Sequence, residues 1–368
     1  MDLYDRSTLT WGQFLLWAGQ QLAPDASHYH AASLFEMPPG LNTERFQQAF
    51  QMLVDRSDTL RSVFLEHEGR TERRVLSELV RPIEIVDLCG ELNPRDAMRQ
   101  WVSCRLTLPI KLDSCLFDSV LLKLDEHRYF WYLCQHHIIC DAWSMSLVFR
   151  KTGEFYGALE SGGDPGLIRV PSYRVFVEAD AAARQSEKGR AAEDYWSRKL
   201  GERSEPLAFY GRRGKALPTR AERVSRDLGE GRSVRLVSLA QRQGLFHKNL
   251  HVTLANMLLA SFVAWLHRVC DTDTVPVGVP YHNRTTSEFK ETPGLFIEVL
   301  PVRSTMKSTD TFLDLMLKLQ AETSENLKHR PYFAQNRLDA PAYEVMFSYH
   351  VATFGEFAGS RVPQEYLH

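Results

Sequence analysis

The sequence predicts a mixed α/β fold in two parts. Helical and strand-like segments alternate in both halves of the chain, and a cluster of chain-breaking residues separates the halves. The composition is globular, with 44% hydrophobic and 24% charged residues. A chain of 368 residues is long enough for two domains, and it buries a core without disulfide or metal staples. We therefore expect one domain over residues 1–165 and another over residues 166–368.

The first half begins with a Trp-rich apolar stretch at residues 8–20, which predicts a short amphipathic helix. Asn42 is placed to cap a second helix. The apolar face of that helix is Phe46, Ala49, Phe50, Leu53 and Val54. A strand-like run follows at residues 80–86. Two further apolar runs, residues 117–124 and 128–136, are separated by three polar residues and predict a hairpin.

The second half begins beyond Ser161–Gly166, the clearest breaker cluster in the chain. Just before the cluster, Ser144 is a candidate N-cap for a helical stripe that runs to Leu159. Helical patterns occupy residues 173–200, 252–266 and 310–327. Strand candidates occupy residues 274–279, 295–302 and 343–349. Both halves thus mix helices and strands, as α/β or α+β layers.

Charge and hydropathy exclude several classes of function. The net charge of −2 favours no polyanionic partner such as a nucleic acid. The most apolar segment, residues 252–266, is about five residues shorter than a membrane span and predicts a buried helix. The N-terminus lacks the apolar region of a signal peptide, and the six cysteines show no paired metal spacing. These features indicate a soluble protein of the reducing cytoplasm, with no membrane, nucleic acid or bound metal.

One local pattern is typical of catalysis. Residues 136–144 read His-His-Ile-Ile-Cys-Asp-Ala-Trp-Ser and lie where a strand gives way to a helix. Neighbouring residues of an extended chain point to opposite faces, so only one histidine of the pair is expected to face a cleft. An imidazole can accept a proton from an attacking amine or hydroxyl, which acyl transfer requires. Asp141 then either orients that histidine or pairs with a distant arginine.

Other interpretations of the pattern stay open at this level. Both histidines could be satisfied packing residues on a core strand. Zinc binding is less favoured, because adjacent histidines do not easily share one ion and no third ligand has suitable spacing. Cys140 lacks an activating partner, and the sequence contains no Gly-x-Ser-x-Gly, Walker A or Rossmann glycine motif.

At these residues the sequence resembles the condensation domains of nonribosomal peptide synthetases, within the His-His-x-x-x-Asp-Gly acyltransferase superfamily. The similar segments follow the family's order over nearly the whole chain. They are Leu9–Gln13 with Trp17, Asp55–Phe64, His136–Ser144, Tyr173–Val177 with Tyr195 and Trp196, Gly278–Arg284, and Gly294–Arg303.

The resemblance implies two chloramphenicol-acetyltransferase-like lobes arranged in a V with a central tunnel. Donor and acceptor carrier proteins, with the neighbouring synthetase domains, would be the partners. Substrates would arrive on the 4'-phosphopantetheine arms of those carriers, and no cofactor would be bound to the domain. By position, His137 is the catalytic histidine, and His136 supports it. Asp141 is expected to form an architectural salt bridge with Arg284 rather than act as a base.

Two departures from the family pattern concern the site. Ala142 replaces the motif's glycine, and its methyl group is a cost if this position needs a positive φ or a close approach by the pantetheine arm. Glu298 and Val299 replace Asn-Thr, and Glu298 is expected near the tunnel or as a surface carboxylate. Gly294 is the other tunnel candidate. Trp143 and Ser144 follow the motif in the order that favours condensation over epimerisation.

Three functions follow from the resemblance. The first is condensation, in which an acceptor nucleophile attacks a carrier-bound acyl thioester to form an amide or an ester. The second is a stand-alone acyltransferase that uses acyl-CoA. The third is a non-catalytic module, weakened at Ala142, that only docks carrier proteins. The family continues beyond the position matching His368, so we expect the second lobe to be incomplete at its C-terminus.

Overall fold

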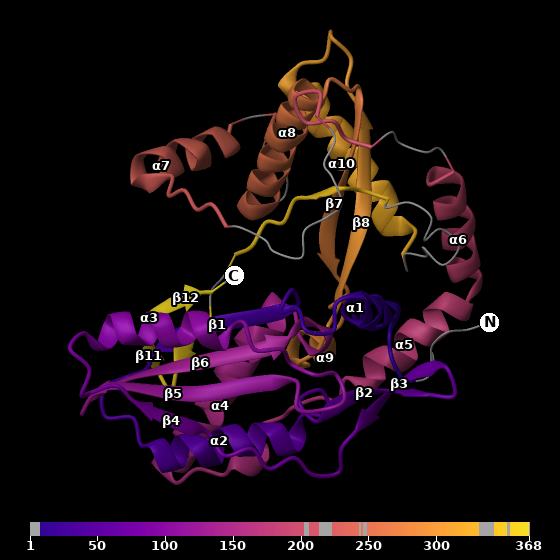
Figure 1. Cartoon of the computed structure of the whole chain (residues 1–368). Helices are drawn as coiled ribbons and strands as arrows, with labels where there is room; N and C mark the ends of the chain where they lie inside the picture. The colour runs from indigo at the N-terminus through magenta and orange to yellow at the C-terminus, as the bar shows by residue number, and fades with distance from the viewer. Residues whose placement is uncertain are drawn as a thin grey trace. The chain divides into compact units, whose positions relative to one another are not determined.

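The computed structural model describes residues 8–201, 206–212, 223–242, 244–245, 249–330, 342–351 and 354–367. Contacts within the chain divide it into two compact units (Figure 1). Unit 1 contains residues 1–181, 283–297 and 352–368, and unit 2 contains residues 182–282 and 298–351. Residues 283–297 follow the breaker cluster in sequence but pack with the first half of the chain.

A five-stranded sheet organises unit 1, in the order β12-β1-β6-β5-β4. The strands are β1 (His30–Glu36), β4 (Glu84–Asp87), β5 (Phe117–Asp125), β6 (Arg128–His136) and β12 (Gln364–Tyr366). β4 runs parallel to β5, and the other neighbours are antiparallel. In the β1–β6 register His30 lies opposite His136, at the end of the sheet where the His-His motif begins.

Helices cover both faces of this sheet, as Figure 1 shows. α2 (Thr43–Arg56) and α4 (Ala142–Ser161) pack on one face, against residues such as Phe35 and Trp131. α3 (Pro94–Arg105) packs on the other face, against the alternate residues Leu34 and Tyr132. The period-2 alternation of buried side chains along β1 and β6 therefore supplies two cores, one on each side of the sheet.

Shorter elements complete unit 1. They are α1 (Trp11–Leu22), the hairpin β2 (Ser62–His67) and β3 (Arg70–Val75), the 3-10 helices η1 (His137–Ile139) and η2 (Pro165–Leu167), α9 (Ser287–Glu291), β10 (Glu356–Phe357) and β11 (Ser360–Arg361). α5 (Arg174–Gln185) begins in unit 1 and ends in unit 2. Phe354 and Phe357 belong to the same core as Phe46 and Trp131, so the last part of the chain contributes to the core of the first sheet.

Unit 2 is built on a three-stranded sheet in the order β8-β7-β9. The strands are β7 (Thr274–His282), β8 (Ile297–Thr305) and β9 (Val345–Met346), and the helices are α6 (Glu187–Lys199), α7 (Gly229–Ala240), α8 (Leu250–Cys270) and α10 (Phe312–Lys328). α8 is long and apolar enough to pass as a membrane span by length and composition. In the structure its Met257, Val263 and Leu266 are buried in the core of unit 2.

Most predicted elements are present. The N-terminal helix, the helix capped by Asn42, the hairpin and the helix ending near Leu327 all lie within about three residues of their expected bounds. The expected strand at residues 80–86 occupies Glu84–Asp87 instead. The N-cap at Ser144 is wrong, because Asp141 caps α4 and accepts the backbone N–H of Ser144.

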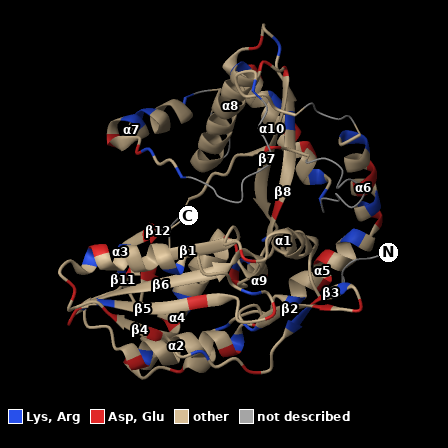
Figure 2. Ribbon diagram, viewed as in Figure 1, with Lys and Arg blue, Asp and Glu red and all other residues tan. Residues whose placement is uncertain are grey.

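Acidic and basic side chains are mixed along the helices, as Figure 2 shows for α2 and α6. α6 alone carries Glu187, Lys188, Arg190, Glu193 and Asp194 within about two turns. Interspersed charges of both signs fit the small net charge of the chain.

Candidate active site

The His-His motif lies at a corner between a strand and a helix, as its sequence predicts. β6 ends at His136, residues His137–Ile139 form the 3-10 helix η1, and α4 begins at Ala142. The backbone N–H of His137 donates to the carbonyl of Tyr29, at 2.6 Å. This hydrogen bond attaches the loop to the turn that precedes β1.

His136 is completely buried and supports the loop. Its Nδ1 accepts the backbone N–H of Ile138 at 3.1 Å, so Nε2 carries the ring proton and donates to Oε1 of Gln20 at 3.2 Å. Burial, reinforced by the neighbouring His30 and His137, lowers the pKa of His136 to about 3. His136 is therefore neutral at physiological pH and makes hydrogen bonds as a fixed tautomer.

His137 is partly exposed, in contrast to His136. Its Nδ1 is buried and has no hydrogen-bond partner among the residues that the structure describes. The exposed part of the side chain therefore does not include Nδ1. His137 is thus the more exposed residue of the pair, and the expectation that it faces a cleft stays a prediction.

Asp141 and Arg284 form a buried ion pair within unit 1. Nη2 of Arg284 donates to both carboxylate oxygens of Asp141, at 3.0 and 3.3 Å, and the side chains of Asp141 and Arg284 are 1% and 0% exposed. Asp141 also accepts the backbone N–H groups of Ser144 at 2.7 Å and Phe296 at 3.0 Å. With its oxygens occupied in this way, Asp141 has no free position for a substrate proton, which fits the expected architectural role.

Arg284 joins the segment 283–297 to the motif. Its Nη1 donates to the carbonyls of Phe289 and Thr292, at 2.6 and 2.7 Å, and its guanidinium lies 4.0 Å from the ring centre of Phe296. Burial lowers the pKa of the guanidinium, and the neighbouring carboxylate of Asp141 opposes that effect. The segment and the motif are thereby held together through one side chain.

Gly294, predicted as a tunnel candidate, contacts the same group of side chains. Its N–H donates to Oγ of Ser144 at 2.8 Å, and its carbonyl accepts from that hydroxyl and from Nη2 of Arg284. Its φ is +154°, and a Cβ there would overlap the ring of Tyr173. Both observations explain why glycine occupies this position.

Ala142 and Trp143 lie in the first turn of α4. Ala142 has helical backbone, and it is not among the described residues with positive φ, so its methyl group causes no backbone strain. Trp143 is 44% exposed, and its indole N–H donates to the carbonyl of Lys290 at 2.9 Å. Trp143 thus fastens α4 to α9 at the start of the helix.

Glu298 lies in unit 2 and is not a surface carboxylate. It pairs with Arg184 at 2.8 Å, and the side chains of Glu298 and Arg184 are 10% and 4% exposed. No local pattern identifies this partner, because Arg184 lies 114 residues earlier. A role of Glu298 in a tunnel stays a prediction.

Cys140 is not a nucleophile in this environment. It is completely buried, and burial, with the nearby carboxylate of Asp141, raises the pKa of its thiol well above the ordinary value. Within the described ranges no group of three or more His, Cys, Asp or Glu side chains is arranged to hold a metal ion.

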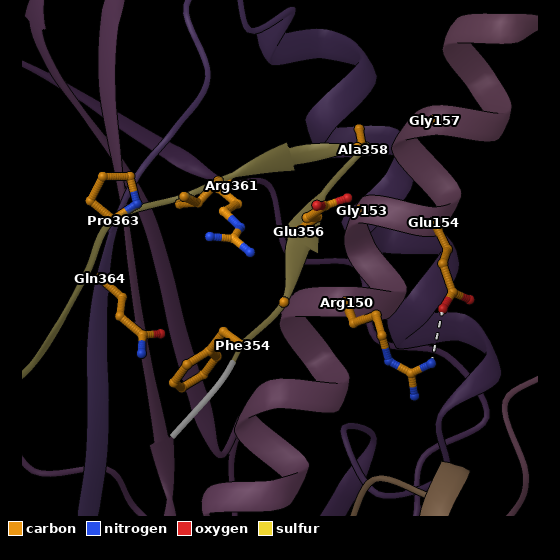
Figure 3. A pocket seen from close by; sticks show the side chains of 13 residues that line it. Arg150, Gly153, Glu154, Gly157, Phe354, Glu356, Ala358, Arg361, Pro363 and Gln364 are labelled. Atoms are coloured by element: carbon orange, nitrogen blue, oxygen red, sulfur yellow. Dashed lines mark hydrogen bonds and ion pairs between the residues drawn. The ribbon is translucent and has the colours of Figure 1, made fainter. Parts of the chain in front are cut away.

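A cavity of about 1020 Å³ lies elsewhere in unit 1, between the middle of α4 and the C-terminal residues 354–364 (Figure 3). Its charged lining includes Arg150, Glu154 and Arg361, and the dashed line in Figure 3 marks the Arg150–Glu154 ion pair. None of the predicted site residues lines this cavity. The motif loop, rather than this cavity, is therefore the candidate site.

Known proteins are similar to this chain in sequence and in fold. The condensation-domain family matches residues 5–336. Isonitrile lipopeptide synthase of Streptomyces coeruleorubidus is 27% identical over 377 residues, which cover 97% of this chain and 25% of that protein. The dimodular nonribosomal peptide synthase of Bacillus subtilis (strain 168) is 23% identical over 326 residues, 88% of this chain and 13% of that protein. The chain thus spans a quarter or less of the length of these relatives.

Solved condensation domains have the same fold. The first condensation domain of the calcium-dependent antibiotic synthetase, in complex with a substrate analogue, aligns with a TM-score of 0.81 and 25% identity over 97% of this chain and 84% of that one. A mutant starter condensation domain of rhizomide synthetase, in complex with C8-CoA, aligns with a TM-score of 0.81 and 22% identity over 100% and 83%.

The fold defines the class first, since it is the two-lobed, chloramphenicol-acetyltransferase-like fold of the solved condensation domains. Within that class, the match over residues 5–336 is decisive. The chain belongs to the condensation-domain family of nonribosomal peptide synthetases.

Sequence reasoning missed several residues that hold the motif. Nε2 of Gln13 donates to the carbonyl of Ile138, and Oε1 of Gln20 accepts from Nε2 of His136. The carbonyl of Tyr29 accepts the backbone N–H of His137. A glutamine at the buried face of an amphipathic helix is the signal that identifies such residues, since a buried amide needs polar partners.

Proposed function

We propose that this domain catalyses amide formation between two carrier-bound substrates. The acceptor amine attacks the thioester carbonyl of the donor, the C–N bond forms and the C–S bond breaks. The amine proton leaves with the pantetheine thiol, either directly or through Nε2 of His137. The observation that carries the proposal is the partly exposed His137, with its Nδ1 turned inward, on a loop fixed by a buried neutral histidine and a buried ion pair.

The environment of Nδ1 bears on the role of His137. An Nε2 that accepts a hydrogen bond from the acceptor amine requires the ring proton on Nδ1, and that buried Nδ1–H has no acceptor among the described residues. An unsatisfied buried donor costs about 1–3 kcal/mol, and this cost is the same whether Nε2 only accepts the hydrogen bond or takes up the proton. We propose that His137 orients the acceptor through Nε2 and assists the proton's transfer.

The relatives are peptide synthetases. We accordingly propose donor and acceptor carrier proteins as partners, with 4'-phosphopantetheine as the carried group. We also propose neighbouring synthetase domains as partners and the cytoplasm as the location.

Product transfer measured by intact-protein mass spectrometry tests the function. The assay combines an acyl-loaded donor carrier with acceptor carriers bearing amines or alcohols, and a parallel arm supplies the donor as acyl-CoA. The variants are His137→Ala and, as a matched control, His127→Ala, because His127 is exposed in the β5–β6 turn.

The expected result is amide product from the wild type and from His127→Ala, with loss in His137→Ala. Product only from alcohols would indicate ester formation. Product only from acyl-CoA would indicate the stand-alone acyltransferase. Equal background in all proteins, with carrier binding retained, would leave a docking module.

A further inference from the structure

Two glutamines of α1 hold the histidine loop from one side. Gln13 and Gln20 are seven residues apart, which places both on the same face of the helix. Nε2 of Gln13 donates to the carbonyl of Ile138 at 3.1 Å, and Oε1 of Gln20 lies 3.2 Å from Nε2 of His136. Both glutamines are buried, at 0% and 5% exposure. The loop is therefore fixed at two points by one helix.

The amide of Gln20 has only one orientation that satisfies its surroundings. Its Nε2 lies 3.0 Å from each of three carbonyl oxygens, those of Ala23, Pro24 and Ala26. A flipped amide would place its oxygen against three acceptors, which is repulsive. Oε1 is thus held toward His136 and can only accept a hydrogen bond there.

His136 transmits this arrangement to the loop. Its Nδ1 accepts the N–H of Ile138, a backbone group that can only donate, so its Nε2 must donate to Gln20. The same glutamine shapes the turn at residues 23–26 that leads to Tyr29. Tyr29 then accepts the N–H of His137. Gln20 is therefore connected to His137 by two routes. One runs through the ring of His136, and the other runs through the backbone of the turn that leads to Tyr29.

We propose that Gln20 is a positioning residue for His137, acting through His136 and the 23–29 turn. The inference rests on the proposed function, in which Nε2 of His137 meets the acceptor. Every group in this chain of hydrogen bonds is neutral, so it fixes a geometry without burying a charge. Displacement of a reacting group by about 1 Å can cost about a hundredfold in rate.

The test compares Gln20→Met with Gln21→Met. Methionine approximates the length of glutamine without its polar atoms, and Gln21 is exposed on the same helix. The readouts are the single-turnover rate constant, the half-saturating carrier concentrations, the melting temperature, and the His136 tautomer by NMR of ¹⁵N-labelled histidine. His137→Ala and the double variant Gln20→Met/His137→Ala are measured beside them.

For Gln20→Met we expect a rate constant lower by about a hundredfold, with half-saturating concentrations within about twofold of the wild type. The NMR spectrum should lose the single Nε2–H tautomer of His136. In the double variant the glutamine change should add little to the loss caused by His137→Ala, because both act on one group. Gln21→Met should match the wild type.

Gln20→Asn is the second variant, because it keeps an amide with both a donor and an acceptor on a side chain that is one methylene shorter. We expect its rate constant to lie between those of the wild type and Gln20→Met. If Gln20→Met fails to fold, this variant supplies the comparison. Failure of both variants to fold, while Gln21→Met folds, would make Gln20 a folding residue and overturn the proposal.

Two other outcomes separate this inference from the proposed function. A normal rate constant in folded Gln20→Met, with His137→Ala inactive, would overturn the positioning role and leave the function intact. A normal rate in His137→Ala would instead contradict the proposed function. If the rate loss in the double variant equalled the combined losses of the two single variants, Gln20 would act independently of His137, and the inference would also be overturned.

Discussion

A single carboxylate connects three parts of the site. Asp141 accepts from the backbone of α4, from the backbone of Phe296 and from the guanidinium of Arg284. Desolvation of a buried ion pair is costly, and these additional hydrogen bonds are what compensates for it. The pair therefore makes the loop, the helix and the segment 283–297 depend on one another.

Asp141→Ala should destabilise unit 1 by about 3–5 kcal/mol, because it leaves the Arg284 charge buried without its partner. Urea unfolding followed by tryptophan fluorescence measures the loss. Arg174→Ala is the control, since it removes a surface pair with Glu178 in which both side chains are more than half exposed. A similar loss in both variants would contradict the importance of burial.

The buried His136 should make stability sensitive to acid. Its folded pKa of about 3 lies below the unfolded value of 6.5, so the unfolded chain takes up the proton first. The stability is complete above about pH 6.5 and falls by about 1.4 kcal/mol per pH unit as the pH decreases toward 3. His136→Gln should reduce this slope between about pH 6 and pH 4.5, as measured by urea unfolding at each pH. His127→Gln should not reduce it, and an unchanged slope in His136→Gln would argue against the neutral buried ring.

At the scale of elements, the segment 283–297 packs closely against α4 and the start of α5, and Gly294 lies at the point of contact. Gly294 has a φ that disfavours other residues and lies against the buried ring of Tyr173. Its backbone also bonds to Ser144 and Arg284. The close approach of the segment therefore requires the absence of a side chain at this position.

Gly294→Ala should displace the segment, lower the melting temperature by several degrees and reduce condensation. Gly90→Ala is the matched control, because a Cβ at Gly90 meets nothing within 4 Å. Differential scanning calorimetry and the mass-spectrometric assay measure the two effects. Equal melting temperatures in both variants would contradict the packing argument.

Local patterns predicted most elements because their signals are local. The helix capped by Asn42 and the β5–β6 hairpin follow from spacing alone. Ser144 failed as an N-cap because its hydroxyl is directed to Gly294 and Arg284, 150 and 140 residues away, while Asp141 caps the helix. Competition between local and distant partners for one side chain is invisible in a sequence.

Part of the site could also be predicted from the sequence. The motif stood out by its local pattern, and the Asp141–Arg284 pair came from the resemblance; the distance between the two side chains is 3.0 Å. Gln20 and the Arg184–Glu298 pair were not predicted, because no spacing links residues that are more than a hundred positions apart.

At the scale of the whole molecule, unit 1 is assembled from three stretches of chain. Phe357, which is completely buried, packs against Phe46, Phe149 and Tyr156 with ring centres 5.5–5.9 Å apart. The core of the first sheet therefore depends on residues near the C-terminus. Unfolding of that segment should weaken elements that precede it by hundreds of residues.

Phe357→Ala should cost about 3–5 kcal/mol, as is usual when a fully buried phenylalanine is truncated. Hydrogen exchange should then accelerate in β1 and β6, although neither strand has been altered. Phe312→Ala, at a 43% exposed position of unit 2, should leave exchange in those strands unchanged. Acceleration confined to residues 354–367 would contradict the cooperative assembly.

The pairing of β12 with β1 also has a consequence for the order of events during translation. Residues 1–181 emerge from the ribosome before Gln364, the first residue of β12, which is 183 positions further along. At about 5–20 residues per second, the unfinished sheet waits for roughly 10–35 s with one strand edge uncovered. During that interval the nascent chain is open to pairing with other chains, so slow synthesis or crowded polysomes should lower the yield of native protein more than the equilibrium stability suggests.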